Sequence, residues 1–91
     1  MRTTAISGRF RKEVRRAERR GKDLAKLQQV IELLCRGQTL PTRYRDHALI
    51  GNFKGCRDCH LEPDWLLIYR LSKDGSMVCL ERTGSHADLF G

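Results

Sequence analysis

No segment of this 91-residue sequence is apolar over the roughly 18 residues that a membrane-spanning helix needs. Residues 1–10 lack the apolar stretch of a secretory signal, which makes the cytoplasm the expected location. No linker, internal repeat or low-complexity tract is visible, and the chain is too short for two cores. We therefore expect a single domain over residues 1–91, without a membrane partner.

The four cysteines do not form a recognisable metal or haem site. The segment Cys56 to His60 matches the C-x-x-C-H pattern of covalent haem attachment, but it resembles a strand and no export signal is visible, so we expect no haem. No second C-x-x-C pair is present, and on one strand Cys56 and Cys59 would face opposite ways, so we expect neither zinc nor any other cofactor. A zinc site built from histidines and Asp64 remains the weaker alternative. Cys35 and Cys79 are expected to be core thiols.

Positive charge is concentrated in the first half of the chain. The net charge is +7, and residues 1–45 carry 13 basic and 4 acidic side chains against 5 and 7 in residues 46–91. This asymmetry predicts contact with nucleic acid, the ribosome or an acidic protein partner.

The first half has helical periodicity. After a possible short strand over residues 2–7, Ser7 can cap a basic helix that ends near Gly21. Asp23 can start a second helix, with an apolar stripe, that ends near Gly37. Only a few residues join the two helices, so an antiparallel helical hairpin is expected.

The second half is typical of strands. After an irregular connection over residues 42–53, we expect strands over residues 54–60, 65–71 and 76–83, a turn at Asp74-Gly75, and a helical turn in the tail. Helices followed by strands predict an α+β fold, in which an N-terminal helical hairpin packs on a small antiparallel β-sheet.

In such a meander, the strand ends near residues 60, 65 and 83 share one edge of the sheet. That edge would collect the following residues, with His47 able to join from the preceding loop: His60, Asp64, Trp65, Arg82 and His86. Imidazoles suit proton transfer near neutral pH, arginine suits phosphate, and an aromatic ring can stack on a base. The cluster could therefore cleave RNA without a metal. The structural alternatives are that His60 pairs with Asp58 or Glu62, and that Trp65 packs in the core.

Two segments carry a family resemblance: residues 47–69 (HALIGNFKGCRDCHLEPDWLLIY) and residues 81–91 (ERTGSHADLFG). They resemble the YafQ branch of the RelE-type toxins, which are mRNA interferases of bacterial type II toxin–antitoxin systems. The resemblance implies a compact RNase fold, cleavage of mRNA in the ribosomal A site and a small antitoxin partner. It implies an active site formed by His47, His60, Asp64, Trp65, Arg82, His86 and Phe90. Cys56 and Cys59 depart from the family, where an aromatic and a small residue are expected.

Together these features predict a ribosome-dependent, metal-independent endoribonuclease toxin. The catalytic residues would be His47, His60, Asp64 and His86, Arg82 would hold the phosphate, and Trp65 and Phe90 would shape the pocket by stacking or packing. The basic first helix would contact rRNA through Arg11, Arg15 and Arg19. The alternative is a non-catalytic RNA- or ribosome-binding regulator, which would use the same helix without needing the histidines.

Overall fold

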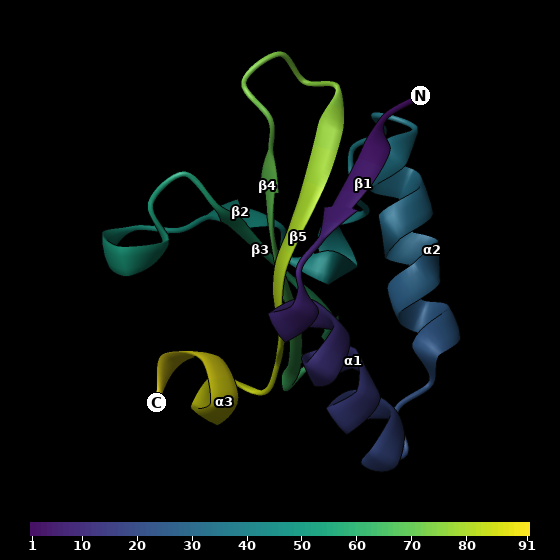
Figure 1. The fold of residues 1–91 in the computed structure, drawn as a ribbon, viewed down its shortest axis with the longest axis vertical. Helices are drawn as coiled ribbons and strands as arrows, with labels where there is room; N and C mark the ends of the chain where they lie inside the picture. Colours follow the sequence, from purple (N-terminus) through teal and green to yellow (C-terminus); the bar gives the residue numbers. More distant parts are fainter.

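The computed structural model describes residues 1–91 as a five-stranded sheet with two helices on one face and a short helix at the C-terminus (Figure 1). The strands are β1 (Thr3–Ile6), β2 (His47–Ala48), β3 (Arg57–Glu62), β4 (Trp65–Leu71) and β5 (Met77–Gly84). The α-helices are α1 (Gly8–Arg19), α2 (Leu24–Cys35) and α3 (His86–Phe90), and two 3-10 helices, η1 (Thr42–Tyr44) and η2 (Gly51–Phe53), flank β2. None of the helices is long and apolar enough to cross a membrane.

The α+β class and the helices on one sheet face are confirmed, but one edge of the sheet needs a correction. The strand order is β1-β5-β4-β3-β2, and β1 runs parallel to β5, so the sheet is mixed rather than antiparallel. Thr3 pairs with Met77, two residues that lie far apart in the sequence. The direction of such a long-range pairing has no local signature. The predicted irregular connection also contains a short strand, β2, which extends the other edge.

Local signals place the two long helices as expected. The Ser7 side chain accepts a hydrogen bond from the Phe10 amide at the start of α1, and the Asp23 side chain caps α2 through the Ala25 amide. Gly21 follows α1 with a φ of 84°, a backbone conformation that costs glycine little. The two helices run in roughly opposite directions across one face of the sheet (Figure 1).

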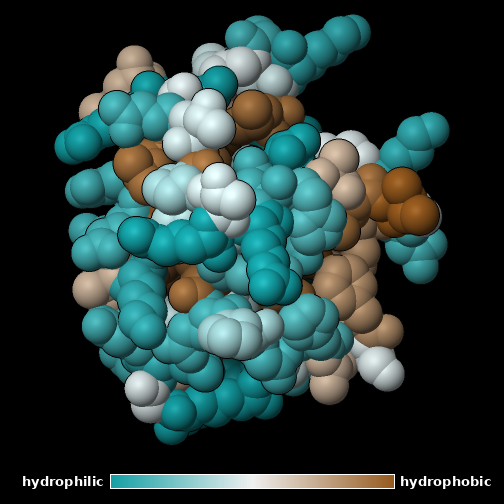
Figure 2. All heavy atoms as spheres, turned by 180° about the vertical axis from the view of Figure 1, so that it is seen from behind, coloured by the Kyte–Doolittle hydropathy of each residue, from teal (hydrophilic) through white to brown (hydrophobic).

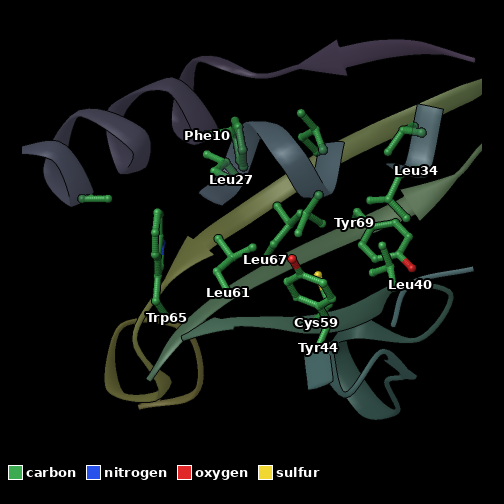
Figure 3. Packing of buried hydrophobic residues seen from close by; sticks show 14 residues of the cluster. Phe10, Leu27, Leu34, Leu40, Tyr44, Cys59, Leu61, Trp65, Leu67 and Tyr69 are labelled. Atoms are coloured by element: carbon green, nitrogen blue, oxygen red, sulfur yellow. The ribbon is translucent and has the colours of Figure 1, made fainter. Parts of the chain in front are cut away.

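The main core lies between these helices and the sheet (Figure 3). Phe10 and Leu27 from the helices meet Leu67 and Tyr69 from β4, and all four are buried. The core thiol is Cys59, which is fully buried, whereas the predicted Cys35 and Cys79 are partly exposed. Cys35 still packs at the margin of the main core, whereas Cys59 lies inside it because its side chain points to the helix side of β3.

The opposite face of the sheet is covered only by short segments. Leu66 and Ile68 of β4 pack there with Leu89 of α3, and Leu49 and Phe53 close over them. Most of the surface seen from behind is hydrophilic, and hydrophobic atoms gather on the flank where η2 and α3 lie (Figures 1 and 2). The candidate site lies on this second, thinly covered face.

Candidate functional site

Strand register brings two of the histidines onto the second face of the sheet. His60 pairs with Leu66 and Asp58 pairs with Ile68, so Asp58 and His60 lie on the face of β3 that is opposite to the helices. His47 of β2 pairs directly with Asp58. The third histidine, His86, begins α3, which packs on the same face. Two short elements, β2 and α3, and the longer strand β3 therefore position the three imidazoles.

Of the residues predicted to converge at this edge, His47, His60, Asp64 and His86 lie together. Trp65 instead packs in the main core, and Arg82 pairs with Glu13 of α1. The ring centroids of His60 and His86 are 5.6 Å apart, and those of His47 and His60 are 6.3 Å apart. At these separations the neighbouring rings contact one another, and His47 and His86 are exposed to solvent.

Asp64 orients His86. One oxygen, Oδ1, accepts a hydrogen bond from the His86 backbone amide at 2.8 Å and lies 2.6 Å from His86 Nδ1. These two contacts, the backbone one first, hold the pKa of Asp64 below its usual value, so the group is a carboxylate that only accepts. Nδ1 of His86 must then carry the shared proton, and Nε2 is the ring atom left for proton transfer.

Asp58 is a site residue that the sequence prediction used only as a structural partner of His60. Its Oδ2 lies 3.7 Å from His47 Nε2 and 4.0 Å from His60 Nε2. The residue is 3% exposed, and its Oδ1 has no hydrogen-bond partner. Burial raises the pKa of Asp58, and the neighbouring imidazoles oppose that rise. The sequence could have indicated Asp58 by its spacing from His60, since residues two apart on a strand lie on the same face of the sheet.

Arg82 is held inside the protein by a second residue that sequence reasoning missed. Arg82 Nε donates to both carboxylate oxygens of Glu13 at 3.0 and 2.8 Å, and its Nη2 lies 2.8 Å from Oε2. Glu13 also accepts from the Thr83 amide, at the point where β1 no longer covers β5. Arg82 Nη1 makes no hydrogen bond with the protein, because Nε and Nη2 make all the contacts with Glu13. The sequence could have indicated that Glu13 is buried, because this acidic residue lies on the apolar face of α1 between Phe10 and Ala17.

The two predicted aromatic residues differ in their surroundings. Trp65 is 1% exposed and its Nε1 donates to Thr83 Oγ1, so packing is its role and its ring is not available to stack on a base (Figure 3). Phe90 is 48% exposed, 6.5 Å from the His86 ring, and packs edge-on against Phe53. Phe53 is a third residue that the sequence reasoning did not single out.

The basic face of α1 is intact. Arg11, Arg15 and Arg19 are exposed and form no ion pair, as expected for groups that contact another molecule. Arg16 and Arg20 instead contact Asp88 at 3.4 and 2.6 Å, which ties α1 to α3. The positive charge of the helix is therefore divided between an outer, unpaired face and an inner face that holds the site element α3.

Comparison with known proteins decides the family. The sequence profile described as "Bacterial toxin of type II toxin-antitoxin system, YafQ" matches residues 2–91. The chain belongs to the YafQ family. It is 48% identical over 86 residues to the mRNA interferase toxin YafQ of Escherichia coli strain K12, covering 93% of this chain and 91% of that protein. The predicted class of enzyme, an mRNA interferase, is confirmed at the level of the family.

Solved structures of similar proteins share the fold. The YafQ chain in a crystal structure of the E. coli DinJ-YafQ complex has a TM-score of 0.90 and 46% identity, with 100% of both chains covered. A metal-bound toxin from Helicobacter pylori has a TM-score of 0.91 and 40% identity, covering 99% of this chain and 100% of that one. The predicted RelE-like architecture is thus shared over essentially the whole chain.

Two of the similar structures, both of toxins from Helicobacter pylori, are metal-bound. No group of three or more His, Cys, Asp and Glu side chains has an arrangement that would hold an ion. Cys56 packs against the second-face cluster, whereas Cys59 lies in the main core, so the two thiols face opposite ways as predicted.

Proposed function

We propose that this chain is a ribosome-dependent endoribonuclease that cleaves mRNA in the ribosomal A site. The observation that carries the proposal is a row of three imidazoles with a carboxylate beside each end. The central ring, that of His60, lies 6.3 Å from the ring of His47 and 5.6 Å from that of His86. A phosphodiester in an RNA chain carries its own nucleophile, the neighbouring 2′-hydroxyl. Cleavage then needs a base on one side of the phosphorus, an acid on the other, and donors for the phosphoryl oxygens.

The histidines would move the two protons. One imidazole takes the proton of the 2′-hydroxyl, and the 2′-oxygen forms a bond to phosphorus. The bond from phosphorus to the 5′-oxygen breaks, and a second, protonated imidazole supplies the proton that this oxygen needs. The products are a 2′,3′-cyclic phosphate and a 5′-hydroxyl. His86, oriented by Asp64, works from one side, and His60 with His47 works from the other.

Two neighbouring groups would hold the RNA. Arg82 Nη1 would donate to a phosphoryl oxygen while Glu13 fixes the rest of the guanidinium. Phe90, exposed beside His86, would pack against a base next to the scissile bond. The side chain of Trp65 acts only indirectly, by packing under the strand end that precedes His86.

The unpaired arginines of α1 would bind the ribosome. Arg11, Arg15 and Arg19 recur every four residues and so share one side of the helix, where they can lie along rRNA phosphates. The same charged side suits an acidic segment of a cognate antitoxin, the kind of partner that a type II system supplies. Affinity for the ribosome should then fall steeply with salt.

Metal independence has a direct test, because imidazoles alone can carry both proton transfers. Cleavage by the purified chain on programmed ribosomes, whose own magnesium is kept, is measured after the chain has been treated with chelator. Unchanged cleavage supports the proposal. A loss that zinc or copper restores would assign this chain a metal requirement instead.

The main experiment maps new mRNA 5′ ends in translating cells that express the chain inducibly. His86→Ala is compared with Ala87→Ser, an exposed neighbour on α3 that serves as the matched control. Cuts at fixed positions within codons, lost in His86→Ala and kept in Ala87→Ser, are the expected result. Growth arrest without new ends, or cuts that persist in His86→Ala, would favour the non-catalytic ribosome binder.

A further inference from the structure

Asp58 is a buried carboxyl group at the site with no role in the proposed proton transfers. It is 3% exposed and makes no hydrogen bond, and its Oδ1 is a buried atom without a partner. A buried carboxylate is costly unless an opposite charge or a donor compensates it. The only other groups within salt-bridge range of it are the Nε2 atoms of His47 and His60. The compensation must come from these two rings or from a proton on Asp58 itself.

The second nitrogen of His47 limits the possibilities. His47 Nδ1 lies 2.7 Å from the carbonyl oxygen of Arg45, which can only accept, so Nδ1 carries a proton. If the ring is neutral, its Nε2 lone pair faces Asp58, which is tolerable only when Asp58 is protonated. If Asp58 is ionised, His47 carries a second proton on Nε2. In either case the charge state of one group affects that of the other, because only 3.7 Å separates them.

We propose that Asp58 is the positioning residue shared by His47 and His60. Its buried carboxylate stabilises the imidazolium that forms when either ring takes the 2′-hydroxyl proton, as Asp64 does for His86. The effect of Asp58 on RNA cleavage rests on the proposed function. The electrostatic coupling between Asp58 and the two imidazoles does not depend on it. The site then contains two imidazole–carboxylate units, one at α3 with an exposed carboxylate and one between β2 and β3 with a buried carboxylate.

Few charged groups surround Asp58, so its electrostatic coupling to the imidazoles can be measured. His60 on its own strand, His47 on β2 and His86 on α3 oppose its raised pKa, in that order of effect, and Asp46 before β2 adds to it. Asp46 is itself bound to Arg57 and to the Tyr69 hydroxyl. The imidazoles are therefore the main groups whose protonation Asp58 can sense.

The first test needs no activity and observes the Asp58 carboxyl carbon by 13C NMR as the pH is varied. In the unaltered chain the carboxyl group should titrate above the ordinary range for aspartate, because it is buried. His60→Gln should move the midpoint further up, since a compensating charge is lost, and by more than His86→Gln does. Equal midpoints in all three proteins, or an ordinary aspartate value throughout, would overturn the proposal.

The second test is the pH profile of cleavage by Asp58→Asn, which keeps the side-chain shape. Without the carboxylate, protonation of His47 and His60 becomes less favourable, so the pH profile of cleavage should move to lower pH. The expected shift is about one pH unit, the smallest effect usual for an opposite charge about 4 Å away. Asp74→Asn, in the turn at the other end of β4, is the matched control.

A rate that falls only in proportion to the folded fraction, with an unmoved profile, would show that Asp58 is structural. Failure of the unaltered chain to cleave RNA on ribosomes would instead refute the proposed function, and the NMR titration would still decide whether Asp58 and the imidazoles are coupled.

Discussion

Replacing Glu13 by Gln should destabilise the protein far more than the same change elsewhere on its helix. Glu13 is 8% exposed and is the only partner of the Arg82 guanidinium, whose side chain is 15% exposed. Gln keeps the volume and one acceptor but removes the charge. Removing one partner of a buried ion pair costs about 3–5 kcal/mol, and the partial exposure of Arg82 reduces this to about 2–4 kcal/mol.

The assay is urea unfolding of the unaltered chain, Glu13→Gln and Glu18→Gln. Glu18 lies on α1 but is exposed and forms no ion pair, so its substitution should change stability by less than about 0.5 kcal/mol. With an m-value of about 2 kcal/mol per M, the Glu13 variant should lose about 1–2 M in its midpoint. The same variant should also weaken cleavage, because Arg82 is no longer held in place.

A double-mutant cycle separates the ion pair from general packing. Once Arg82→Gln has been made, Glu13→Gln should cost less than it does alone, with a coupling of about 1–3 kcal/mol. If the Glu13 and Glu18 variants unfold within 0.5 kcal/mol of each other, or if the cycle shows no coupling, the reasoning about this buried pair is wrong.

Three further predictions concern other parts of the structure. Asp88 has its pKa held below the usual value by Arg20 and by the Ser85 amide, so its contribution is present at neutral pH and disappears as the pH falls. Asp88→Asn should therefore lower the Tm by about 5 °C at pH 7, with the gap closing in acid, and an equal gap at low pH would contradict this. Trp65, the single tryptophan, should resist iodide quenching, with or without ribosomes, until the chain unfolds. Cys59 is fully buried and burial raises the pKa of its thiol, so mass spectrometry should find it alkylated last of the four cysteines.

Much of the fold could be predicted because its signals are local. The Ser7 and Asp23 caps, the glycines after the helices and the Asp74-Gly75 turn each act through backbone groups a few residues away. The strand over residues 65–71 has the predicted bounds, because its residues favour a strand and turns limit it on both sides. Turn positions alone also predicted which histidines meet.

The burial and pairing of single charges could not be predicted from the sequence. In the sequence, Glu13 is one acidic residue in a basic helix. In the structure it binds the Thr83 amide and the Arg82 side chain, which are accessible because β1 ends before this part of β5. Trp65 could equally have stacked on RNA, and only the side of β4 on which it lies places it in the core.

Periodicity, turn chemistry and long motifs were enough to predict the helices, most of the strands, the family and the types of side chain gathered at the site. Folding was needed to pair β1 with β5 in parallel, to hold Arg82 against α1 and to bury Asp58 beside two imidazoles. Each of these depends on segments far apart in the chain coming together, and the free energy of a buried charge is set by the groups that surround it after folding.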